Sequence, residues 1–178
     1  MNKMSARERI EFKVISFMHS TLYGFFVDPY DMLRKAGISK GQRVLEVGFG
    51  PGFFTIPAGK IVGTTGHVYG IDINPVALEA VEKKVSEEGL ENISLELRDA
   101  LATELDDESF DLCFLFGVFH SFKETDPLVR EMYRILVPHG LMSIQAGRVA
   151  SEKIIKQVTK DGLFIHENGT KILKFCKQ

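Results

Sequence analysis

The segment that most restricts the fold is a short apolar strand followed at once by three glycines. Arg43–Val47 is a short strand, apolar except for Arg43 and Glu46, and Gly48, Gly50 and Gly52 follow at alternate positions. Glycines let the backbone turn sharply and let a ligand approach it, because they have no Cβ. A strand, a glycine turn and a helix, here to about Val62, open a doubly wound α/β fold. Ligands bind in such folds at the carboxyl edge of the sheet.

The rest of the chain alternates apolar strands with helices. Dipeptides of Asp or Asn followed by Pro supply a capping side chain and a first-turn proline, and they predict helices from residue 28 to about 37, 74 to 88 and 126 to 136. A further helix is expected over residues 151–160. Apolar runs predict strands over residues 67–73, 93–97, 110–116 and 141–146.

Asn168-Gly169 predicts a hairpin between two final strands. Apolar strands separated by helices indicate a mostly parallel sheet covered on both faces. The fold class is therefore α/β: a doubly wound, Rossmann-like, seven-stranded and mostly parallel sheet with an antiparallel terminal hairpin strand.

The chain of 178 residues fits a single domain, expected to span residues 1–178. Residues 1–38 are expected to form an N-terminal helical cap, since Ile10, Val14 and Phe17 recur near helical spacing. Residues 39–178 would form the α/β core.

Composition excludes several classes of function. A formal net charge of −2 gives no general attraction to nucleic acid. Cys113 and Cys176 lack the spacing of metal ligands or of a disulfide framework, so we expect no metal and a reducing compartment. We also find no signal peptide and no apolar run long enough for a membrane span, and we expect a soluble, cytoplasmic protein. Oligomeric state is not readable from the sequence.

The glycine turn itself does not separate dinucleotides from other adenosine-containing ligands. Asp72 lies 20 residues beyond Gly52, where a carboxylate can accept hydrogen bonds from ribose hydroxyls. Three residues argue against a pyrophosphate. Phe53 occupies the place of the third glycine of the dinucleotide pattern, and Pro51 lacks a backbone donor. Glu46 would repel phosphates but attract a cationic ligand.

With these residues in view, the chain resembles the class I methyltransferases, in particular the small-molecule branch that includes the ubiquinone and menaquinone methylases. VLEVGFGPG resembles their first motif, GIDIN their ribose-binding motif and Arg98-Asp99-Ala100 their adenine-binding turn. FDLCFLFGVFH and REMYRILVPHGLMSI resemble the fourth-strand motif and the helix, turn and fifth strand. Two positions depart from the pattern: Phe49 replaces a small residue, and His139 replaces a glycine, which leaves the geometry of that turn open.

The resemblance implies S-adenosylmethionine as the cofactor and assigns roles by position. Glu46 would face the methionine amino end, and Gly48, Gly50 and Gly52 would make room for the cofactor. Asp72 would bind the ribose. The remaining implied contacts are Ile73 on the adenine face, Asp99 and Ala100 at the adenine edge, and Phe116 and Gly117 around the methionine.

The reaction implied is in-line displacement at the sulfonium methyl, for which the protein supplies alignment and a water-poor pocket. His120 is the candidate for a general base or an acceptor contact, and a purely structural role is equally compatible with its position. His19 and Tyr23 are candidate substrate contacts from a helix that could also simply pack on the domain. The pairs Phe25-Phe26 and Phe53-Phe54 could line an acceptor pocket, although core packing explains most such aromatics.

The acceptor is expected to be a small molecule. The sequence lacks the Asp/Asn-Pro-Pro-aromatic motif and the Pro-Cys nucleophile after the fourth strand, which disfavours methylation of amide or base nitrogens and of cytosine carbon. Two other functions stay open: a non-catalytic protein that binds S-adenosylmethionine, and a nicotinamide-dependent oxidoreductase, against which Glu46, Pro51 and Phe53 argue.

Overall fold

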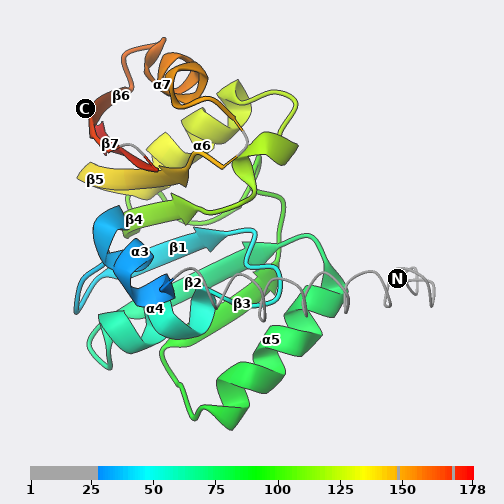
Figure 1. Cartoon of the computed structure of the whole chain (residues 1–178). Coiled ribbons are helices and arrows are strands. Elements are labelled where there is room, and N and C mark those ends of the chain that lie inside the picture. The colour runs from blue at the N-terminus through cyan, green and yellow to red at the C-terminus, as the bar shows by residue number, and fades with distance from the viewer. Residues whose placement is uncertain (1–27, 148, 170) are drawn as a thin grey trace.

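A computed structural model describes residues 28–147, 149–169 and 171–178 of the chain. It contains a seven-stranded sheet in the order β3-β2-β1-β4-β5-β7-β6. Strands β1 to β5 are parallel to one another, whereas β7 is antiparallel to both β5 and β6. This arrangement confirms the predicted fold class (Figure 1). The strands are β1 (Arg43–Val47), β2 (His67–Asp72), β3 (Ile93–Leu97), β4 (Phe110–Leu115), β5 (Leu136–Gln145), β6 (Phe164–Asn168) and β7 (Ile172–Lys177).

Two of the three helices predicted from an Asp-Pro or Asn-Pro dipeptide begin with the predicted cap, whereas the third begins at Asp126 itself, after Thr125, which makes no capping side-chain hydrogen bond. The Asp28 carboxylate accepts the backbone N–H of Tyr30 at 2.9 Å, and the Asn74 side chain accepts that of Val76 at the same distance. Both are N-caps followed by a proline, which has no N–H to lose in the first turn. The α-helices are α3 (Pro29–Ala36), α4 (Thr55–Val62), α5 (Pro75–Glu87), α6 (Asp126–Ile135) and α7 (Ser151–Thr159), and a 3-10 helix, η2 (Phe119–Ser121), follows β4.

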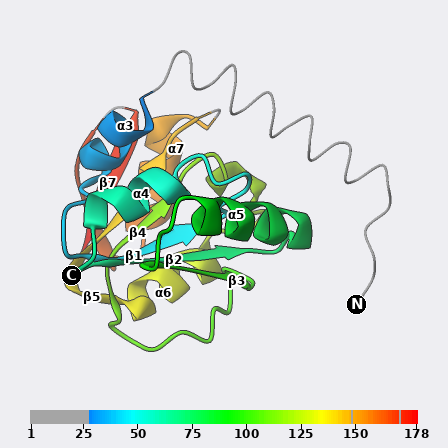
Figure 2. The ribbon, with the colours of Figure 1, turned by 90° about the horizontal axis from the view of Figure 1, so that it is seen from below.

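Helices cover both faces of the sheet, as the apolar strands predict. Figure 2 shows α4 and α5 above β1, β2 and β3, with α6 below them. Successive β4 side chains point to opposite faces: Leu112 and Phe114 pack in one apolar cluster with residues of α3 and α4, whereas Cys113 and Leu115 pack in another with α6 and α7. The sheet is therefore rigidly held, and its carboxyl edge is a firm platform for a site.

One strand differs from expectation, and it contains the turn at His139 whose geometry the sequence left open. Strand β5 begins at Leu136, directly after α6, because Leu136 pairs with Phe110 at the start of β4. The predicted start at residue 141 comes after a register shift in this pairing. His139, between the two, has φ 63°, so a histidine adopts the left-handed conformation that glycine favours.

The predicted terminal hairpin is confirmed as β6 and β7, and Gly169 between them has φ 120°. None of the helices that the structure describes combines the length and apolar character of a bilayer span. Most of the expected N-terminal helical cap, including Ile10, Val14 and Phe17, lies outside the described residues.

Candidate cofactor-binding site

A cavity of about 510 Å³ opens at the carboxyl ends of the central strands. Strands β1 and β4 are neighbours although β2 and β3 lie between them in the chain, so the strand order reverses here. Ligands of doubly wound folds bind at such a reversal. The residues that line the cavity are Glu46, Val47, Gly48, Phe49, Gly50, Pro51, Phe53, Phe54, Ile71, Asp72, Ile73, Arg98, Asp99, Ala100, Phe116, Gly117, Val118, Ser121, Phe122 and Gln145.

Of the ten residues predicted to contact the cofactor, all except Gly52 line this cavity. Sequence segments that are far apart therefore meet at one edge of the sheet, as the motif order predicts. The roles assigned to the individual residues stay predictions.

The three glycines of the turn differ in what a Cβ at each position would meet. All three have positive φ: 75° at Gly48, 49° at Gly50 and 77° at Gly52. A Cβ at Gly50 would meet nothing within 4 Å, so this glycine leaves open space. A Cβ at Gly52 would lie 2.9 Å from both methyl groups of Val81 on α5. Gly52 therefore makes room for helix α5, and its expected role at the cofactor stays a prediction.

Gly48 also has a neighbour inside the protein. A Cβ there would lie 2.8 Å from Cγ2 of Val118, in the segment that follows β4. Since Gly48 and Val118 both line the cavity, this close approach brings the turns after β1 and β4 together at its floor.

Glu46 is the most unusual polar residue of the cavity. Its side chain is only 3% exposed, and no group among the described residues hydrogen-bonds its Oε2. Burial raises the pKa of Glu46 to about 8; the Asp72 carboxylate raises it further, whereas the Thr55 hydroxyl lowers it. A buried carboxylate with an unpaired oxygen is costly, and a cationic group in the cavity would relieve that cost.

Asp72 ends β2 and is bound to two loops. Its Oδ2 accepts the N–H of Gly50 at 2.9 Å, and its Oδ1 accepts the N–H of Asn74 at 2.9 Å. A carboxylate has about four acceptor positions, so two remain for a ligand. Asp72 can therefore hold the glycine turn and accept ligand hydroxyls at the same time.

The next part of the wall offers an apolar surface beside a polar turn. Ile73 is 77% exposed, which is unusual for an isoleucine and leaves its side chain available as a flat apolar contact. Asp99 is exposed and accepts the N–H of Leu101 at 2.9 Å, while Ala100 is buried.

Aromatic side chains form another part of the cavity lining. The rings of Phe53 and Phe54 meet edge to face with centroids 4.8 Å apart, and those of Phe54 and Phe116 at 5.0 Å. All three line the cavity together with Phe122, and Phe54 and Phe116 also belong to an apolar cluster of the core. Their meeting depends on the turns after β1 and β4 lying side by side, which residue spacing alone does not reveal.

The candidate general base is placed less favourably. His120 lies on η2 and is exposed; its neighbours Val118 and Ser121 line the cavity, but His120 does not. The other two predicted substrate contacts, His19 and Tyr23, lie outside the described residues, as do Phe25 and Phe26.

Comparisons with known proteins agree with this architecture. The chain is similar to an S-adenosylmethionine-dependent methyltransferase from Aquifex aeolicus of known structure, with a TM-score of 0.80 and 22% identity over 99% of this chain and 100% of that one. A putative methyltransferase of the same type from Methanococcus maripaludis gives a TM-score of 0.79 at 16% identity, over 100% and 96% of the two chains. The strand order and the cavity thus define a domain with the class I methyltransferase fold.

Sequence comparison is more specific. A family model described as a methyltransferase domain matches residues 38–175. The demethylmenaquinone methyltransferase of Lactobacillus johnsonii is 29% identical over 141 residues, covering 79% of this chain and 58% of that protein. That of Geobacillus stearothermophilus is 31% identical over 111 residues, covering 62% and 47%. The chain belongs to the methyltransferase domain family, which confirms the resemblance of its motifs, and it spans about half the length of these curated relatives.

Proposed function

We propose that this chain binds S-adenosylmethionine in the cavity and catalyses transfer of its sulfonium methyl group to a small-molecule acceptor. The observation that carries the proposal is the buried Glu46 carboxylate, whose Oε2 has no partner among the described residues, in the lining of a cavity that Gly50 leaves open. This ligand carries an ammonium and a sulfonium, so it can supply a cationic partner for the carboxylate. Residues 38–175 also match the methyltransferase domain model.

The remaining lining residues fit the other parts of the ligand. Asp72 has two acceptor positions left for the ribose hydroxyls. Exposed Ile73 would pack on the adenine ring, and the Asp99-Ala100 turn would meet its edge. Phe116 and Gly117 would close the methionine end.

When bound, the cofactor supplies an activated methyl group that needs no further activation by the protein. The chain's own contribution is therefore alignment and exclusion of water. The aromatic side chains of Phe53, Phe54, Phe116 and Phe122 form an apolar wall that keeps water from the same cavity. This wall suits an acceptor with a planar, apolar body, and the curated relatives are named for methylation of demethylmenaquinone.

His120 stays our candidate for the base, if the acceptor must lose a proton. His120→Ala tests the assignment: loss of rate together with loss of the acidic limb of the pH–rate profile would support it. An unchanged rate and profile would show that His120 has no such role, which its exposed position outside the cavity lining already favours. The cytoplasmic location expected from the sequence stays a prediction.

The experiment for this proposal supplies S-adenosylmethionine with an isotopically labelled methyl group and a panel of reduced quinones, phenols and small thiols. We expect label in an acceptor and one equivalent of S-adenosylhomocysteine for each methyl transferred. The Asp72→Ala variant is the control for contaminating activity. Binding of the cofactor without turnover on any acceptor would instead support a non-catalytic binding protein. Failure to bind the cofactor would refute both readings.

A further inference from the structure

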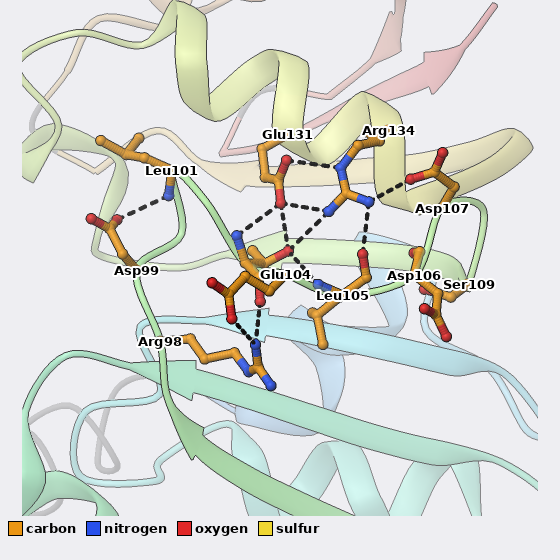
Figure 3. Close-up of polar contacts among 11 residues, drawn as sticks. Arg98, Asp99, Leu101, Glu104, Leu105, Asp106, Asp107, Ser109, Glu131 and Arg134 are labelled. Atoms are coloured by element: carbon orange, nitrogen blue, oxygen red, sulfur yellow. Dashed lines mark hydrogen bonds and ion pairs between the residues drawn. The ribbon is translucent and has the colours of Figure 1, made fainter.

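The loop between β3 and β4, residues 98–109, forms one wall of the cavity without any helix or strand of its own. It carries Asp99 and Ala100 at the cavity. Backbone hydrogen bonds to the rest of the domain fix the ends of this loop, at Arg98, Glu108 and Ser109, and side chains hold its middle part. Figure 3 shows a polar network between this loop and helix α6, with Glu131 and Arg134 at its centre.

Thr103 is the point at which the loop is anchored. Its side chain is fully buried. Its backbone N–H and its hydroxyl both donate to Oε1 of Glu131, at 2.8 and 2.5 Å. Its carbonyl accepts a hydrogen bond from Nη1 of Arg98 at 2.6 Å. Thr103 is thus held from the α6 side by Glu131 and from the β3 side by Arg98.

Glu131 is in turn fixed by Arg134, one helical turn later. Arg134 donates from Nε to Oε2 at 3.0 Å and from Nη2 to Oε1 at 2.7 Å, a two-point contact between guanidinium and carboxylate. Its Nη1 donates to the carbonyl of Leu105 at 2.7 Å and also contacts Asp107 (Figure 3). The hydrogen bonds from Arg134 and from Thr103 hold the pKa of Glu131 down at about 2, so its carboxylate is charged.

The turn that faces the cavity joins this anchor directly. Asp99 accepts two backbone N–H groups ahead of it, that of Leu101 through Oδ1 at 2.9 Å and that of Ala102 through its carbonyl at 3.2 Å. The next residue is Thr103. A movement of Thr103 would therefore shift this compact turn as a unit. Neither Thr103 nor Glu131 nor Arg134 lines the cavity.

We propose that Glu131 is a positioning residue for recognition of the adenine edge: through Thr103 it fixes the Asp99-Ala100 turn against the ligand. This inference rests on the proposed function, because it needs an adenine ring in the cavity. It predicts that weakening the anchor lowers affinity for the adenine amino group specifically, and not for every ligand of the cavity.

The test compares two ligands by calorimetry: S-adenosylhomocysteine, and S-inosylhomocysteine, in which an oxygen replaces the adenine amino group. The variants are Thr103→Val, which keeps the shape but removes the hydroxyl, Glu131→Gln, and the milder Arg134→Lys. Thr103→Ser, which keeps the hydroxyl, is the rescue. Ser143→Ala is the matched control, since Ser143 is buried, donates to the carbonyl of Ala36 at 2.6 Å and lies outside the cavity lining.

The wild-type chain should prefer the adenosyl ligand. Thr103→Val and Glu131→Gln should weaken that ligand roughly tenfold while affecting the inosyl ligand far less, so that the preference shrinks. Thr103→Ser should restore the preference for the adenosyl ligand. Ser143→Ala should lower thermal stability and leave that preference unchanged. Should one of the first two variants not fold, the other and Arg134→Lys carry the same test.

Two results would overturn the proposal. One is an unchanged ratio of the two affinities in anchor variants that fold; the other is a wild-type chain that binds both ligands equally well. A wild-type chain that binds neither ligand is a different outcome, because it refutes the proposed function itself.

Discussion

The Asp72 carboxylate accepts the backbone N–H of Gly50 at 2.9 Å, which ties the end of β2 to the glycine turn that follows β1. The same carboxylate accepts the N–H of Asn74 through its other oxygen. One side chain therefore joins two neighbouring loops at the cavity. Removing it affects the shape of the turn as well as any hydrogen bond to a ribose.

Asp72→Ala should weaken binding of S-adenosylhomocysteine by about 100-fold, since two hydrogen bonds to a charged group are lost. Isothermal titration calorimetry measures the change. Asp111→Asn is the matched control: Asp111 also accepts a backbone N–H, that of Arg43 at 2.7 Å, but it lies at the amino end of β4 and outside the cavity lining. Equal losses of affinity in both variants would contradict the role given to Asp72.

Alanine at Gly50 should mainly lower cofactor affinity, whereas alanine at Gly52 should mainly lower stability. A Cβ at Gly50 projects into open space, so Gly50→Ala should fold with a modest loss of stability, about 1 kcal/mol for the left-handed backbone, yet lose most cofactor affinity. A Cβ at Gly52 would collide with Val81, so Gly52→Ala should lower the melting temperature much more. Thermal melts and calorimetry of both variants check this. Normal cofactor affinity in Gly50→Ala would be the contrary result.

Glu46→Gln should stabilise the ligand-free protein more strongly as pH rises. The pKa of Glu46 is raised to about 8 by burial, against 4.5 in its ordinary setting, so the folded state holds an extra proton between these values. The contribution of this bound proton to the free energy of unfolding is complete below pH 4.5 and is lost as pH rises through 8. Between the two values, the gap in unfolding free energy between the variant and the wild type should widen by about 1.4 kcal/mol for each pH unit.

Urea denaturation at pH 6 and pH 8 measures this gap. Saturating S-adenosylhomocysteine should narrow it, because the ligand ammonium then accompanies the ionised carboxylate. A gap that is equal at the two pH values would show that the pKa of Glu46 is not raised in the free protein.

The contribution of Glu131 to stability should have the opposite pH dependence to that of Glu46. Its pKa is held at about 2, so its favourable contribution is complete above pH 4.5 and is lost as pH falls through 2. The wild type should lose about 3 kcal/mol of stability by this route between pH 4.5 and 2, and Glu131→Gln should not. Denaturation at pH 6 and pH 3 compares the two proteins, with Glu82→Gln on exposed α5 surface as the control. Parallel acid profiles of wild type and Glu131→Gln would contradict the assignment.

Local chemistry explains which parts of the fold the sequence predicted. Asp28 and Asn74 cap helices through bonds to residues only two positions later, so a short window of sequence contains the whole interaction. The start of β5 was missed because Leu136 joins the sheet by pairing with Phe110, a partner 26 positions away. Strand ends set by a distant partner are not visible in a local pattern.

The candidate site also divides into features that a local sequence pattern predicts and features that depend on distant contacts. Motif order predicted which strand ends meet, and nine residues expected at the cofactor do line one cavity. The close approach of Gly52 to Val81, 29 positions later on α5, is not visible in a local pattern. The Phe53, Phe54 and Phe116 wall and the anchor at Thr103 also depend on contacts between segments far apart in the chain.

Direct titration of the purified protein with S-adenosylmethionine, and in parallel with NADH, tests the central claim that the cavity holds a cationic adenosyl ligand beside Glu46. We predict heat of binding with S-adenosylmethionine at one site per chain, and none with NADH. Binding of NADH in place of S-adenosylmethionine, or of neither ligand, would contradict the account.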